Sequence, residues 1–162
     1  KSLAGLQELS ELFHDRTVHK EYLCVVNGVL KGKKHIKGYL YKDTKLNKVT
    51  IYRQKEKDAQ PIETVYEPLG DNGRVTLLKV GLITGRTHQI RVHMNHIGHP
   101  LPGDYLYNPD YRLIKRQALH SCRLTFCHPI SGKPMDFTAP IPDDFKTFAC
   151  GCVELHQYAD NG

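Results

Sequence analysis

The stretch Thr84-Gly85-Arg86-Thr87-His88-Gln89-Ile90-Arg91-Val92-His93 is the most informative part of the sequence, because a glycine turn in it joins a strand pattern to a helix pattern. Ile90, Met94 and Ile97 fall at positions i, i+4 and i+7, which is the spacing of one face of a helix. Residues 98–100, Gly-His-Pro, end this pattern. The sequence therefore predicts a helix of about three turns inserted after a strand.

Strand patterns lie on both sides of this helix. The clearest is residues 21–30, which are rich in β-branched and aromatic side chains and end before Gly32. Leucines from Leu3 to Leu12, followed by Phe13, recur at helical spacing and predict an amphipathic helix, and a short helix is predicted from Pro142-Asp143. Asp-, Asn- and Gly-containing turns separate further strands, predicted at 35–41, 48–53, 62–69, 75–83, 117–128 and 133–139.

Together these elements predict one α+β domain with a mixed, mostly antiparallel and meander-like sheet and flanking helices. We expect the domain to occupy residues 1–148, with residues 149–162 as a C-terminal tail, because no linker or repeat divides the chain. The sequence opens directly in a helical pattern, and from this we expect that an earlier N-terminal segment is missing.

The composition favours a polyanionic partner. The formal net charge is +6 and the sequence pI is about 9.0, and Lys and Arg side chains gain affinity for nucleic acid by releasing condensed counterions. No apolar run approaches the roughly 20 residues of a membrane span, and no signal-peptide core is present. Five cysteines, an odd number, favour a reducing compartment. From the composition we expect a cytoplasmic protein whose leading partner is nucleic acid, with an anionic membrane as the second choice. We expect no nucleotide cofactor, and the sequence does not predict the oligomeric state.

The residues around the glycine turn could bind an anion. Arg86 lies where the predicted helix begins, and free backbone N–H groups and the helix dipole favour negative charge there. His88 and Arg91 are three residues apart, so we expect a basic, polar face opposite the apolar one. The alternative is that both arginines are solvated or form ion pairs with carboxylates such as Asp104.

Beyond this local chemistry, the order of motifs resembles a known family. The runs GRTHQIRVH (85–93), HIGHP (96–100) and GDYLY (103–107) resemble the conserved core of RluA-type (RluA/RluD-like) RNA pseudouridine synthases. Residues 16–23, 116–121 and 128–140 resemble the family's RxVxKxY strand entry, its RQxLHA segment and its closing hairpin, so the resemblance covers roughly residues 1–148.

The resemblance implies a function and also shows one departure. Members of the family isomerise uridine to pseudouridine in structured RNA, ribosomal or transfer, without a cofactor, after flipping the base out of its stack. Their catalytic aspartate lies in a motif HRLDxxTSG, which is absent from this sequence. Asp15, Asp43 and Asp104 occupy other parts of the pattern. We therefore expect a pseudouridine synthase fold that is incomplete at its N-terminus and a chain that is inactive alone.

The resemblance also implies roles for individual residues. Tyr22 is the expected active-site tyrosine, whose ring stacks on the base and whose hydroxyl handles a proton. Arg91 is expected to pair with the absent aspartate and to have lost that partner here. Arg86 is assigned to RNA phosphate or to bracing the catalytic loop, and Leu119 to closing the base pocket. The remaining residues expected on the substrate side are His88, Gln89 and His120. The two histidines are expected to act as hydrogen-bonding scaffold rather than as acid–base catalysts.

Two other interpretations remain open. Histidines and cysteines gather around residues 88–99 and 120–128, but neither group has metal-ligand spacing, so we expect no metal. A noncatalytic RNA-binding module would retain the basic residues without the aspartate. The lysine-rich stretch 31–57 either follows the RNA backbone or protects strand edges from aggregation.

Overall fold

The computed structural model describes residue 7 and residues 18–43, 48–108, 112–149 and 151–152. The helix predicted over residues 3–13 lies outside these residues except for Gln7, so it stays a prediction. Most ends of the predicted strands and of the two later predicted helices lie within one or two residues of the observed ends.

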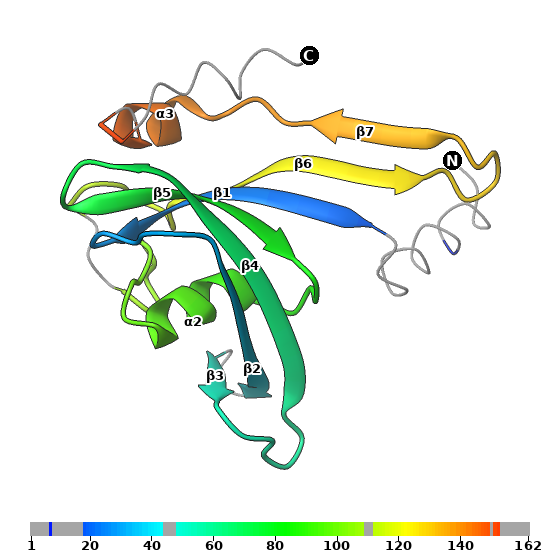
Figure 1. Ribbon diagram of the computed structural model, residues 1–162, viewed down its shortest axis with the longest axis horizontal. Coiled ribbons are helices and arrows are strands. Elements are labelled where there is room, and N and C mark those ends of the chain that lie inside the picture. The colour runs from blue at the N-terminus through cyan, green and yellow to red at the C-terminus, as the bar shows by residue number, and fades with distance from the viewer. Residues whose placement is uncertain (1–6, 8–17, 44–47, 109–111, 150, 153–162) are drawn as a thin grey trace.

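One seven-stranded sheet organises the described residues, in the order β3-β2-β4-β5-β1-β6-β7 (Figure 1). Every pairing in it is antiparallel, so the α+β prediction is confirmed and the described strands contain no parallel pair. The predicted meander is wrong in two respects, because β2 lies between β3 and β4, and β1 lies between β5 and β6. The strands are β1 (His19–Asn27), β2 (Lys34–Asp43), β3 (Lys48–Tyr52), β4 (Gln60–Asp71), β5 (Val75–Leu82), β6 (Leu119–Cys127) and β7 (Pro134–Thr138).

Strand β1 has this central place because its middle is apolar on both faces. Leu23 and Val25 pack in one core cluster together with helix α3 (Asp143–Ala149). Cys24 and Val26 pack in a second cluster together with helix α2 (Gln89–His96). A strand whose side chains are buried on both sides must have a layer over each face. The two faces of β1 therefore separate two environments, which we call the α2 face and the α3 face.

Helix α2 is enclosed on more than one side. Ile90 and Met94 pack against β1 and β5, whereas Val92 packs against Leu40 of β2 and Val49 of β3. Figure 1 shows the strongly twisted sheet curling so that β2, β3 and β4 pass beside α2. The face of α2 that we expected to be basic and solvated is therefore covered by the curled sheet and by the segment around Gly103 that follows the helix.

That segment crosses close to a later part of the chain at Gly103. Its φ of +71° lies in the left-handed region, and an added Cβ would lie 2.1 Å from the carbonyl oxygen of Arg116. The Ala118 N–H donates to the Pro102 carbonyl at 3.0 Å and fixes this crossing. Glycine at 103 thus allows Asp104 to enter the interior beside α2.

Helix α3 covers the other face of the sheet, where Phe145 and Ala149 are fully buried. The side chain of Cys152 also packs against this cluster. The predicted boundary at residue 148 stays untested, although the described residues next to it pack on the domain. Neither described helix has the length and hydropathy of a membrane-spanning segment.

Replacing Gly103 with alanine should strongly destabilise the fold. The substitution adds left-handed strain of about 1–2 kcal/mol and a backbone clash that costs roughly 1–3 kcal/mol more. Gly73→Ala is the matched control, because Gly73 also has positive φ (+82°) but no atom lies within 4 Å of its added Cβ. Urea unfolding of the three proteins measures the difference; equal losses for both variants would show that the close crossing does not matter.

Candidate active site

Strand β1 carries the predicted tyrosine on its α2 face. Tyr22 pairs in register with Val80 and Ser121 and packs against the α2 core cluster. Burial raises the pKa of Tyr22, and a hydrogen bond with Ser121 opposes that rise. A tyrosine with this environment keeps its proton at neutral pH and can donate or relay it.

Lys20 is on the same face, two residues before Tyr22. Its Nζ lies 3.6 Å from the position that a Cβ on Gly85 would occupy, so the lysine reaches the turn that leads into α2. Partial burial lowers the pKa of Lys20. The predicted strand entry and the predicted glycine turn are thus neighbours in space, although 65 positions separate them in sequence.

The turn into α2 is built from a strained histidine. His88 has a φ of +57°, which is uncommon for a residue with a side chain and costs of order 1–3 kcal/mol. Its Nδ1 is 3.2 Å from the Tyr107 hydroxyl, and that hydroxyl accepts the Val49 N–H at 3.1 Å. Burial lowers the pKa of His88, and the positive charges of Arg91 and Lys42 lower it further. Arg86, just before this turn, is exposed.

Arg91 forms a buried ion pair. Its Nε and Nη2 donate to the two carboxylate oxygens of Asp104 at 2.7 and 2.6 Å, and the two side chains are only 6% and 1% exposed. Burial by itself lowers the pKa of Arg91, but the hydrogen bonds and charge of Asp104 outweigh it and raise the pKa overall. The rings of Tyr105 and Tyr107 lie 5.7 and 5.2 Å from the guanidinium carbon, within cation–π range.

This pair changes one expectation. We expected Arg91 to have lost the absent aspartate as its partner, with an ion pair to Asp104 as the alternative, and the structure shows that alternative pair. Asp104 also accepts the N–H groups of Leu106 and Tyr107, so it fixes the local chain as well as the arginine. The sequence offered Asp104 only as one possible ion-pair partner, because a spacing of 13 residues across a loop has no periodic signal.

Gln89 is a scaffold residue in this structure. Its side-chain oxygen accepts from Thr84 Oγ1 and the Arg86 N–H, and its nitrogen donates to the Glu63 carbonyl and Thr64 Oγ1. These bonds use both donors and both acceptor positions of the amide. All polar atoms of the Gln89 side chain are therefore already hydrogen-bonded within the protein, which leaves none for the expected contact with substrate. Gln89 instead ties the turn to β4.

The two predicted residues of β6 lie on opposite faces of the sheet. Leu119 packs against the α2 core cluster, on the same face as Tyr22, and its pocket-closing role stays a prediction. His120 pairs with Leu23 on the α3 face, where its ring lies 6.3 Å from that of Phe145 and its Nε2 is 3.3 Å from the Ala139 oxygen. His120, which we expected among the substrate-side residues but more as scaffold than as an acid–base group, thus lies on the face of the sheet opposite Tyr22.

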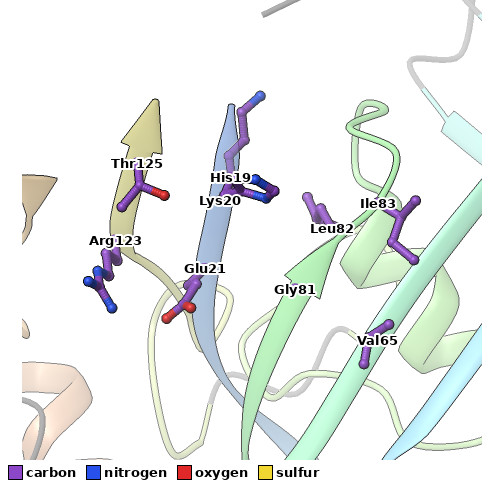
Figure 2. Close-up of a pocket in the computed structure, with 9 residues that line it drawn as sticks. All are labelled: His19, Lys20, Glu21, Val65, Gly81, Leu82, Ile83, Arg123 and Thr125. Carbon is purple, nitrogen blue, oxygen red and sulfur yellow. The ribbon is translucent and has the colours of Figure 1, made fainter. Parts of the chain in front are cut away.

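A cavity of about 440 Å³ lies next to this region (Figure 2). Figure 2 shows His19 and Lys20 at the start of β1 and Ile83 beyond the end of β5. The volume suits a nucleotide-sized ligand, but none of the predicted site residues lines it; only Lys20 borders both places. The lining residues are His19, Lys20, Glu21, Val65, Gly81, Leu82, Ile83, Arg123 and Thr125.

The histidines and cysteines considered as metal ligands do not converge in the described part of the chain, which contains no cluster of three or more His, Cys, Asp or Glu side chains suited to a metal ion. The Nδ1 atom of His93 instead forms a hydrogen bond with Thr64 Oγ1 at 2.8 Å. The buried Nε2 atom of His93 has no hydrogen-bond partner. No pattern in the sequence predicted that the side chain of His93 would be buried.

Removing the carboxylate of Asp104 should cost about 3–5 kcal/mol of unfolding free energy, because it leaves the buried charge of Arg91 unpaired. Asp136→Ala is the matched control: Asp136 also receives two hydrogen bonds from one arginine, Arg123, but both side chains are about half exposed. We expect little change there. Chemical denaturation of Asp104→Ala and Asp136→Ala tests this, and similar losses in the two variants would contradict it.

Stability should also fall in mild acid because of His93. Burial, with a smaller effect from His96, lowers the pKa of His93 from 6.5 to about 4. Neutral His93 makes its full contribution to the free energy of unfolding above the unfolded pKa of about 6.5. That contribution is lost as the pH falls toward 4, and the loss is roughly 2 kcal/mol between about pH 7 and pH 5. Denaturation at both pH values measures it. His93→Asn, which keeps a group able to bond Thr64, should flatten this dependence; an unchanged slope would exclude His93 as its cause.

The arrangement around α2 can be compared with known proteins. The sequence profile of the RNA pseudouridylate synthase family matches residues 1–96. An uncharacterized RNA pseudouridine synthase of Helicobacter pylori is 40% identical over 136 residues, covering 83% of this chain and 52% of that protein. The ribosomal large subunit pseudouridine synthase D of Haemophilus influenzae is 35% identical over 160 residues, covering 90% and 48%. The chain thus spans about half the length of these curated relatives.

The fold agrees with this sequence relationship. The structure of human RNA pseudouridylate synthase domain containing 1 superposes with a TM-score of 0.76 at 23% identity, covering 93% of this chain and 65% of that one. Human RNA pseudouridylate synthase domain containing 4 gives a TM-score of 0.73 at 20% identity, with 93% and 68% coverage. Since the family profile matches more than half of the chain and the fold is the same, the chain belongs to the RNA pseudouridylate synthase family.

Proposed function

We propose that the whole protein isomerises uridine to pseudouridine within RNA, and that this chain supplies the base-binding and arginine side of the active site. The observation that carries the proposal is the meeting of two distant motifs: the strand of Lys20 and Tyr22 lies against the turn and helix of residues 84–93. The reaction breaks the bond from N1 of the base to the sugar and forms a carbon–carbon bond from C5, releasing the C5 hydrogen to solvent.

Each side chain in this region has a matching task. The Tyr22 ring lies on the face where a flipped base would stack, and its protonated hydroxyl can serve a proton transfer. Leu119 supports the base from β6. Exposed Arg86 is available for phosphate, whereas Arg91, already positioned by Asp104 and two tyrosine rings, provides fixed positive charge.

The nucleophilic carboxylate is proposed to come from a segment outside these 162 residues, because the HRLDxxTSG motif does not occur in the sequence. Buried Asp104 does not replace it, because its side chain is only 1% exposed and belongs to the GDYLY motif. The chain alone is then inactive and acts as an RNA-binding module. The name of the Haemophilus influenzae relative favours ribosomal over transfer RNA as substrate.

The test is tritium release from RNA labelled at C5 of uridine, with the whole protein and with the 162-residue chain. We expect release from the whole protein only. Tyr22→Phe in the whole protein should reduce release by roughly a hundredfold or more, the range for loss of a proton-transfer group. Tyr66→Phe is the control, because Tyr66 is a strand tyrosine buried in the core at 1% exposure.

Three results would contradict parts of the proposal. Release by the chain alone would show that the carboxylate lies within it. No release from the whole protein despite RNA binding would remove the synthase function and leave the binding module. Equal activity of Tyr22→Phe and Tyr66→Phe would remove Tyr22 from the chemistry.

A further inference from the structure

Three tyrosines gather on the outer face of β2 and β3, the face turned away from α2. Tyr39 and Tyr41 are two residues apart on β2, and Tyr39 is directly paired with Tyr52 of β3. Residues paired across antiparallel strands share a face, and residues two apart on a strand do too. We call Tyr39, Tyr41 and Tyr52 the tyrosine face.

The inner sides of the same strands explain why the tyrosines point outward. Leu40 of β2 and Val49 of β3 are buried at 4% and 3% exposure and pack with Val92 of α2. The alternation of the strand therefore sends Tyr41 and Tyr52 out, and they are 38% and 37% exposed. Cross-strand pairing of aromatic residues stabilises this outer face, and the exposed rings are also available to a partner.

Cations lie at one end of the tyrosine face. Arg53, Lys55 and Lys57 follow Tyr52 directly in the turn to β4 and are exposed, with only Glu56 and Asp58 as nearby opposite charges in sequence. Other lysines of the stretch 31–57 are neutralised by acidic residues of β4: Lys31 pairs with Asp71, Lys33 with Glu67 and Lys37 with Glu63. The basic stretch 31–57 is thus divided into a paired part and a part available to phosphates.

The tyrosine face is also continuous with the candidate active site. Lys42 follows Tyr41 on β2, on the other side of the strand, and its charge acts on His88 at the turn into α2. Adjacent side chains of one strand therefore connect the site to the outer face.

We propose that the tyrosine face binds a single-stranded RNA segment that flanks the target uridine. Its bases stack on the exposed rings, and Arg53, Lys55 and Lys57 contact its phosphates. The Cβ atoms of residues paired across antiparallel strands are about 5 Å apart, and those two positions apart along one strand are about 7 Å apart, so neighbouring tyrosines can each take a separate base. The identity of the polymer as RNA rests on the proposed function, whereas the stacking surface is defined by the structure.

The experiment measures binding of the 162-residue chain to two labelled RNAs, a hairpin with and without a single-stranded uridine flank, by fluorescence anisotropy. The unsubstituted chain should bind the flanked RNA more tightly. Tyr41→Ala and Tyr52→Ala should each weaken binding of the flanked RNA at least about fivefold and leave binding of the plain hairpin unchanged.

Control variants separate stacking from loss of structure. Phe137→Ala removes an aromatic ring that is 48% exposed on β7, at the opposite edge of the sheet, and should change neither affinity. Tyr41→Trp enlarges the stacking surface without removing packing, and should tighten binding of the flanked RNA. Thermal unfolding of every variant shows which of them keep the fold.

Several outcomes would overturn the inference. One is equal binding of the two RNAs by the unsubstituted chain, and another is the same loss for the tyrosine and Phe137 variants. A change in self-association instead of RNA affinity would identify the face as an interface between copies. None of these outcomes depends on tritium release by the whole protein, so the synthase function can stand while this inference fails.

Discussion

The bidentate ion pair between Arg91 and Asp104 is the constraint on which the architecture around α2 depends. Two charges that are 6% and 1% exposed are tolerated only if each satisfies the other. Asp104 reaches Arg91 because the chain passes through a left-handed glycine at 103 and lies against the 114–118 segment. The ion pair therefore fixes the position of α2 and the path of the loop through Gly103 together. The candidate site next to them is held by the same rigid elements.

The second constraint is the double-sided burial of β1. Consecutive residues of this strand serve different layers, so Tyr22 lies with α2 and Leu23 with α3. The partner strand β6 follows the same alternation, which places Leu119 with the tyrosine and His120 behind the sheet. A single strand can thus combine a reactive face and a purely structural one, and neighbouring positions in a motif need not share a role.

The sequence predicted most of the fold, because strands rich in β-branched residues and turns rich in Asp, Asn and Gly have strong local signals. It did not predict that β1 lies between β5 and β6, since strand order depends on packing between distant segments. Arg91 was expected on a polar face because helical periodicity assumes one solvent side, and α2 has almost none at its start. Gln89 and His120 were assigned from motif membership, which carries no information on hydrogen-bond saturation or on which face of a strand a residue occupies.

Tyr107 has a consequence that reaches beyond the site. Its hydroxyl accepts the N–H of Val49, on the outermost strand of the sheet, while it also contacts His88 at the entrance to α2. An unpaired N–H on an edge strand is a point at which another polypeptide can add a strand. One phenol group therefore occupies a position that intermolecular pairing would need. A substitution near His88 that no longer positions Tyr107 would therefore expose the edge of the sheet as well as disturb the turn into α2.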